Sequence, residues 1–169
     1  MVNKMFFLYT VLFVFLSMLT QALFIAHVPD IIFYLAKHRS EKPLNTVIHA
    51  PVTNAKLRKV VLPNPDFIYS AVFYDISEYD LRISTHFPSD SQYACMAFYN
   101  DKAQPYFIIN NLNNRKGKIT VGLASSIEND ERIKSPSRQG VILMRYLVKD
   151  SFQMSKTFML QKMFRINKI

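Results

Sequence analysis

The stretch from Leu44 to Asp75, LNTVIHAPVTNAKLRKVVLPNPDFIYSAVFYD, decides how this chain folds. A basic, extended run at Arg58–Leu62 leads into the corner Pro63–Asp66, and a strand-like run follows from Phe67 to Ile76. The two prolines of the corner fix their own φ angles and lack backbone donors, so they belong at a turn or at a sheet edge. The aromatic and β-branched residues of the last run predict a central strand that is covered on both faces.

The sequence beyond this stretch predicts an antiparallel β domain. Between Asp80 and Phe87 apolar and polar residues alternate, which is typical of a half-buried strand. Other short apolar runs, bounded by turn-forming residues, predict strands at Lys59–Leu62, Tyr93–Tyr99, Tyr106–Ile109 and Ile119–Leu123. The run Gly140–Val148 fits either a strand or a helix. About seven short strands without regular helices between them predict a mainly β, antiparallel sandwich-like domain or a partial barrel, and argue against an α/β fold.

Length and composition allow one packed domain with an appendage. The chain has 169 residues, half of them hydrophobic, with 14 Phe and 9 Tyr but only 3 Gly, so it can build a core and is not rich in linkers. Its single cysteine, Cys95, excludes an internal disulfide framework and a cysteine-rich zinc site. The formal net charge of +9 lies almost wholly after Ala26 and suits an anionic lipid surface. Nucleic-acid binding is not expected, because no basic cluster is interleaved with aromatic residues on a recognisable fold.

The segment Met5–Ala26 carries no charge over 22 residues. At about 1.5 Å per residue it can cross the ~30 Å hydrocarbon core of a bilayer as a helix. A cleaved signal peptide is the alternative, with a poor cleavage site at Thr20–Ala22, but the apolar run continues past that site. We therefore predict an uncleaved, single-pass anchor over residues 1–28, followed by a β-sandwich-like domain over residues 29–150.

Two further segments have helical character and two interpretations each. Pro29 and Asp30 begin a segment with a broad apolar face and a basic end, which predicts an amphipathic helix either at the membrane boundary or packed on the β domain. Residues 151–169 are predicted to form a basic amphipathic C-terminal tail, with Phe152, Met159, Met163 and Ile166 at roughly helical spacing and Phe158, Leu160 and Phe164 broadening the apolar side. A helix in this tail could lie on the bilayer or close one end of the sandwich.

Three motifs carry a family resemblance. They are Asn45-Thr46 with His49-Ala50, then Pro63-x-Pro65-Asp66-x-x-Tyr69-Ser70 with Tyr74-Asp75-Ile76-Ser77, and finally Ser135-Pro136-Ser137-x-x-Gly140. With them the chain resembles the bacterial domain-of-unknown-function family 1254, and is most similar to short membrane-anchored members that are often encoded beside a family 1214 protein. The resemblance implies a β-sandwich-like domain and no established activity. Glu78-Tyr79-Asp80 departs from the Gly-Pro that is common in the family at this point, and the tail matches no family pattern.

The resemblance and the flanking charges point to different sides of the membrane. Larger relatives tend to be exported, which implies a cell inner membrane protein with a periplasmic body. Lys37, Arg39 and Lys42 instead favour a cytoplasmic body under the positive-inside rule.

The sequence contains no recognisable catalytic motif. Cys95 lies in the alternating run YACMAFY and is better explained as a small core residue than as a nucleophile. His49 and His86 lack the short-range spacing of metal ligands, and the chain has no Gly-rich phosphate loop or Gly-x-Ser-x-Gly elbow. We therefore expect no catalytic residue, no metal and no cofactor.

Polar side chains converge only around the opening stretch. The ligand-binding candidates are His49, Asn64, Asp66, Tyr69 and Asp75. Their structural alternative is that Asn64 and Asp66 tie the corner, Tyr69 buries its ring, and Asp75 accepts amides of the following turn.

Three hypotheses of function follow. The first is a non-enzymatic envelope protein, in contact with membrane lipid, that binds another protein such as a family 1214 partner. The second is a small-ligand-binding or hydrolytic domain that uses the corner Asn64–Asp75. The third is a protein that acts on a lipid surface through its basic segments.

Overall fold

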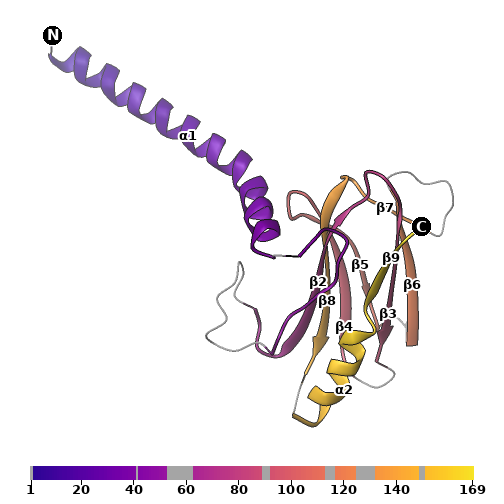
Figure 1. Cartoon of the computed structure of the whole chain (residues 1–169). Helices are drawn as coiled ribbons and strands as arrows, with labels where there is room; N and C mark the ends of the chain where they lie inside the picture. Colours follow the sequence, from indigo (N-terminus) through magenta and orange to yellow (C-terminus); the bar gives the residue numbers. More distant parts are fainter. Residues whose placement is uncertain are drawn as a thin grey trace.

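The computed structural model describes residues 2–40, 42–52, 63–88, 92–112, 117–124, 132–148 and 151–169. A long helix, α1 (Val2–Arg39), leads into a β domain, and a short helix, α2 (Ser151–Lys162), lies near its C-terminal end (Figure 1). The predicted strand Lys59–Leu62 and the basic approach to the corner lie outside the described residues.

Two sheets make up the β domain. The five-stranded sheet is antiparallel throughout and has the order β1 (Ile48–His49), β2 (Phe67–Asp75), β8 (Gln139–Leu147), β4 (Ala94–Asn100) and β5 (Pro105–Asn110). The four-stranded sheet has the order β7 (Arg132–Lys134), β6 (Gly117–Ala124), β3 (Leu81–Phe87) and β9 (Arg165–Lys168), and only β6 and β7 run parallel. The prediction of a mainly β, sandwich-like domain with an N-terminal apolar helix and a C-terminal helix is confirmed.

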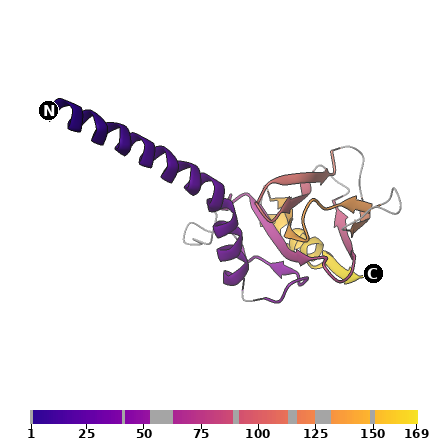
Figure 2. The same cartoon turned by 90° about the horizontal axis from the view of Figure 1, so that it is seen from above.

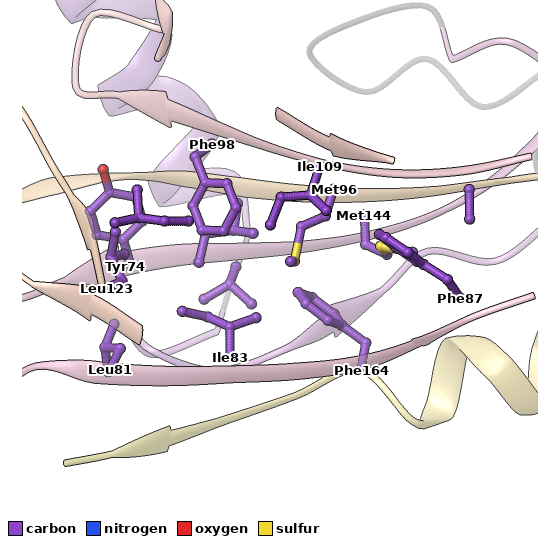
Figure 3. Packing of buried hydrophobic residues seen from close by; sticks show 14 of the residues in the cluster. Tyr74, Leu81, Ile83, Phe87, Met96, Phe98, Ile109, Leu123, Met144 and Phe164 are labelled. Atoms are coloured by element: carbon purple, nitrogen blue, oxygen red, sulfur yellow. The ribbon is translucent and has the colours of Figure 1, made fainter. Parts of the chain in front are cut away.

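The core lies between the two sheets, as Figure 3 shows. Along β2 and β8 every second residue is buried, because successive side chains of a strand point to opposite faces. Tyr74, Phe98 and Met144 point inward from the larger sheet and meet Leu81 and Ile83 from the smaller one. The alternation predicted between Asp80 and Phe87 is therefore confirmed.

The ambiguous run Gly140–Val148 is a strand, and it holds the central place of the larger sheet. β8 pairs with β2 on one side and with β4 on the other, in continuous register. β2 was predicted to be central, but it lies second from the edge, beside the two-residue strand β1. Its outer face is half-buried, and the ring of Phe33 from α1 packs edge-on against Phe73 at 6.1 Å.

The C-terminal residues are built into the sandwich. Phe164, which follows α2, is 1% exposed and points into the core, and β9 pairs with β3 so that Ile166 lies opposite Ile83 (Figure 3). The buried hydroxyl of Thr157 on α2 accepts a hydrogen bond from the side-chain amide of Gln92 at 2.7 Å. This arrangement corresponds to the interpretation in which α2 closes one end of the sandwich.

Helix α1 runs without interruption through Pro29, where we predicted a new helix to begin. Proline removes the hydrogen bond to the preceding turn, which is a common cause of bending, and the axis of α1 changes direction in its C-terminal part (Figure 1). The N-terminal part projects far from the β domain (Figure 2), and it is long and apolar enough to cross a membrane.

Candidate functional site

The five candidate residues lie in three separate places along β2. Because a strand rises ~3.3 Å per residue, the nine residues of β2 separate its two ends by about 26 Å. Asn64 and Asp66 lie before the first end, while Asp75 is the last residue of the strand. The structure therefore does not bring Asn64, Asp66 and Asp75 into one corner.

Asn64, Asp66 and Tyr69 come together at the start of β2. The side-chain oxygen of Asn64 accepts the backbone N–H of Asp66 at 2.9 Å, and the Asn64 N–H donates to the Tyr69 hydroxyl at 3.1 Å. The Asp66 carbonyl accepts the N–H of Val148 at 2.7 Å. These bonds close a turn and attach it to the end of β8. Asn64 ties the corner through its side chain and Asp66 through its backbone groups, while the Tyr69 ring is half-buried.

His49 lies on the edge strand β1, close to α2. Its Nδ1 lies 2.9 Å from the Ser70 hydroxyl, and Ser70 is fully buried. Burial of the ring, together with the nearby charge of Lys162, lowers the pKa of His49. His49 pairs with Ser70 in the sheet, and Ser70 is five residues, or about 16 Å of strand, from Asp75.

Asp75 belongs to a hydrogen-bonded chain that ties the end of β2 to α1. Its carboxylate accepts the Ser77 N–H at 2.9 Å and the Gln139 side-chain amide at 2.6 Å, and the Gln139 oxygen accepts Lys37 Nζ from α1 at 3.1 Å. Burial alone would raise the pKa of Asp75. The hydrogen bonds from Ser77 and Gln139 and the charge of Lys37 outweigh it, so the pKa is lowered and the carboxylate is ionised at neutral pH.

Asn45 completes this chain from the other side. It adopts a left-handed backbone conformation, with φ 60°, which asparagine tolerates better than most residues. Its side-chain oxygen accepts the Asp75 N–H and its amide donates to the Asp75 carbonyl, both at 2.8 Å. The Asn45 side chain thus takes the place of a neighbouring strand at the end of β2, and the same amide donates to the Tyr79 hydroxyl at 3.0 Å.

A small open pocket lies beside this chain. Its volume is ≈ 210 Å³, and it is lined by Leu44, Asn45, Asp75, Ser77, Glu78 and Tyr79. Sites for drug-sized ligands are usually larger, at roughly 300–1,000 Å³. Of the five sequence candidates only Asp75 reaches this pocket. Among the described residues, no group of three or more His, Cys, Asp or Glu could hold a metal ion.

The third sequence motif, Ser135–Gly140, serves a buried hydroxyl network. The Tyr74 hydroxyl lies 2.9 Å from the Ser135 hydroxyl and 3.1 Å from that of Tyr106, and it donates to the Tyr99 carbonyl at 3.3 Å. Burial raises the pKa of Tyr106 far above its usual value, so its hydroxyl stays neutral. A Cβ on Gly140, opposite Tyr74 in the sheet, would collide with the Tyr74 hydroxyl and the Tyr99 carbonyl.

Cys95 has the core environment that its sequence context predicts. It is 1% exposed and lies on β4 opposite Arg145 of β8, whose guanidinium contacts the sulfur at 3.6 Å. Burial, with a hydrogen bond from the Tyr93 hydroxyl to the Cys95 sulfur, raises the pKa of the neighbouring Tyr93. Neither the contact between Cys95 and Arg145 nor the hydroxyl network of Tyr74 was among the sequence candidates, because both depend on cross-strand register.

Comparison with known proteins agrees with this architecture. A family model described as "Protein of unknown function (DUF1254)" matches residues 44–168. The chain belongs to the DUF1254 family. The matched residues include α2 and β9, so the C-terminal segment that matched no pattern in the sequence lies within the family model. No curated protein matches the chain.

Two solved structures share the fold. The VPA0106 protein from Vibrio parahaemolyticus superposes with a TM-score of 0.63 and 10% identity, over 83% of this chain and 35% of that one. An uncharacterized protein from Burkholderia cenocepacia superposes with a TM-score of 0.51 and 12% identity, over 89% of this chain and 42% of that one. The DUF1254 chain described here thus spans well under half the length of either protein. At these identities the likeness shows the fold alone.

Proposed function

We propose that this DUF1254 protein is a non-enzymatic, single-pass membrane protein of the cell envelope whose β-sandwich binds a second protein domain. The observation that carries the proposal is the size of the solved relatives. In them the matched fold occupies 35% and 42% of the chain, so the same sandwich is covalently joined to further polypeptide. We infer that the sandwich offers a surface on which another domain can rest, and that a family 1214 protein is the partner.

The edge strand β5 supports such a surface. Phe107, Ile108 and Leu112, which lie on β5 or just after it, are 36%, 54% and 72% exposed. We refer to these three residues as the β5 surface. Large apolar side chains gathered at one exposed sheet edge are typical of a protein-binding site.

The arrangement of polar residues favours binding over chemistry. The ionised carboxylate of Asp75 is engaged by Ser77 and Gln139, and Asn64 closes a turn. His49 contacts Ser70, and about 16 Å of strand separates Ser70 from Asp75, too far for that carboxylate to orient the imidazole as a general base. A hydrolytic or ligand-binding role at Asn64–Asp75 would need these groups to converge.

Pull-down from detergent-solubilised membranes tests the proposal. We expect the full-length chain, co-expressed with its family 1214 neighbour, to recover that protein, and we expect Ile108→Asp to abolish the recovery. Met159→Asp is the matched control, because Met159 is 67% exposed on α2 and lies outside the β5 surface. Recovery of monomer alone under mild conditions, or equal recovery with both variants, would contradict the proposal.

The compartment needs a separate test. We propose that the anchor lies in the cell inner membrane with the sandwich on the periplasmic side, as the exported relatives imply. A reporter fused after Ile169 that is active only in the periplasm should then be active. Activity of a reporter that works only in the cytoplasm would instead favour the orientation indicated by Lys37, Arg39 and Lys42.

A further inference from the structure

The C-terminal part of α1 has two distinct faces. From Pro29 onward half-buried residues recur with helical spacing, at Pro29, Phe33, Ala36 and Lys37 and at Ser40 just after the helix. Of these, Phe33 and Lys37 contact the β domain. On the opposite side four large apolar side chains are exposed, namely Ile31 (53%), Ile32 (44%), Tyr34 (59%) and Leu35 (47%). We refer to these four as the outer face of α1. At 100° per residue they cluster away from the half-buried stripe.

The rotation of this segment is fixed by the sandwich. Phe33 packs on Phe73 of β2, and Lys37 donates to Gln139, which in turn donates to Asp75. Turning the outer face inward would break the aromatic contact and the hydrogen-bonded chain together. The folded protein therefore presents the outer face of α1 to whatever surrounds it.

The length of α1 shows where the outer face lies if the helix is an anchor. The uncharged run Met5–Ala26 is already long enough to cross the ~30 Å hydrocarbon core. The segment Pro29–Arg39 then begins within one turn of the core boundary, at the depth of the lipid headgroups. Pro29, at its start, allows the helix to leave the direction of the span.

The chemistry of the segment suits that depth. Tyrosine is favoured at membrane interfaces, where its ring is buried and its hydroxyl is hydrated. Ile31, Ile32 and Leu35 can enter the acyl boundary, while the exposed His38 and Arg39 continue on the same side into the headgroup layer. The ring of Tyr34 lies 4.2 Å from that of His38, so the apolar and basic parts of the face are contiguous.

We propose that Pro29–Arg39 is an interfacial helix whose outer face rests in the headgroup region of an anionic bilayer. The sandwich is then held against the membrane in one orientation, not suspended on a flexible tether. This inference rests on the membrane anchoring contained in the proposed function. It adds a second contact with lipid, made by the outer face of α1 in addition to the membrane span. It also fixes the orientation of the β domain relative to the membrane.

The chain contains no tryptophan, so the fluorescence of a single introduced tryptophan reports on its position alone. Single Tyr34→Trp or Leu35→Trp variants of the full chain would be reconstituted into vesicles of phosphatidylglycerol and phosphatidylcholine. We expect a blue-shifted emission, strong quenching by lipids brominated close to the headgroup, and little quenching by aqueous acrylamide. Two control positions complete the set: Leu16→Trp inside the predicted span, and Met159→Trp on the exposed side of α2.

The controls separate failure of the inference from failure of the anchor. If Leu16→Trp is quenched by deeply brominated lipids while Tyr34→Trp and Leu35→Trp respond only to acrylamide, like Met159→Trp, the anchor stands and the interfacial helix is refuted. If Leu16→Trp is not quenched by brominated lipids, the anchoring itself fails. If the indoles at positions 34 and 35 are shielded from both quenchers, protein covers the outer face, which also overturns the inference.

Discussion

Replacing Gly140 with alanine tests how the middle of the larger sheet is packed. A Cβ at this position would collide with the Tyr99 carbonyl oxygen and with the hydroxyl end of Tyr74. Neither can yield easily, since one is strand backbone and the other is the centre of a buried hydroxyl network that includes Tyr106 and Ser135. Gly140→Ala must therefore displace a fully buried ring.

The cost follows from two contributions. Forcing extra volume into a packed core costs about 1–3 kcal/mol. Separating the Tyr74 hydroxyl from its partners leaves buried polar groups unpaired, at about 1–3 kcal/mol. We expect the free energy of unfolding to fall by about 2–6 kcal/mol, a large part of the ~5–15 kcal/mol that is typical of a domain. At roughly 3 °C per kcal/mol, the unfolding midpoint should fall by about 6–18 °C.

Near-ultraviolet circular dichroism of the detergent-solubilised chain, followed during heating, measures this loss. Gly122→Ala is the matched control, since the atoms nearest to its Cβ all belong to the side chain of Arg132, which is 36% exposed, with Cγ at 2.9 Å. It should cost less than Gly140→Ala, because a partly exposed side chain yields more easily than strand backbone and a buried ring. Because the Tyr74 hydroxyl is one of the atoms struck, Tyr74→Phe with Gly140→Ala should cost less than the sum of the single changes. Equal stabilities for Gly140→Ala and Gly122→Ala would refute the reasoning.

Three further predictions concern the connection between α1 and the β domain. Asn45→Ala removes two hydrogen bonds to Asp75 and strains a left-handed backbone. Urea unfolding should therefore show a free energy of unfolding lower by about 2–3 kcal/mol. An unchanged midpoint would mean that the Asn45 bonds do not stabilise β2. The lowered pKa of Asp75 gives stability that is present above the ordinary carboxyl pKa and lost as the pH falls through the lower folded value. Asp75→Asn should therefore flatten the pH dependence of unfolding below about pH 4, and an identical acid limb in both proteins would contradict this. Phe33→Ala removes the ring contact with Phe73, so limited proteolysis between α1 and β1 should become faster, whereas the exposed-side variant Ile32→Ala should leave the rate unchanged.

Patterns within a single helix or strand could be predicted from the sequence, but pairings between strands could not. The alternation at Leu81–Phe87 and the uncharged run at Met5–Ala26 are local, so both elements were expected. β1, β7 and β9 have two, three and four residues, too few to show a periodicity, and they exist because neighbouring strands pair with them. Helix α1 continues through Pro29 even though proline disfavours a helix interior, and the packing of Phe33 on Phe73 supports the last turns.

The candidate site shows the same limit. Asn64, Asp66 and Asp75 are close in sequence, which suggested one corner, but an extended strand carries its two ends far apart. The bond between Asn64 and Asp66 could be anticipated from turn chemistry. The place of Gly140 opposite Tyr74 is a matter of register, and no feature near either residue in the sequence reveals it.

The Asn45 side chain also makes the two edges of the larger sheet unequal. At one edge β1 pairs over only two residues, and the amide of Asn45 occupies the backbone groups of Asp75 that a further strand would need. At the other edge β5 runs for six residues, and the one proline in it, Pro105, stands at its start. A polypeptide that joins this sheet by strand addition is thus directed to β5. On the side that faces α1, Asn45 blocks extension of the sheet because it occupies the backbone groups of Asp75.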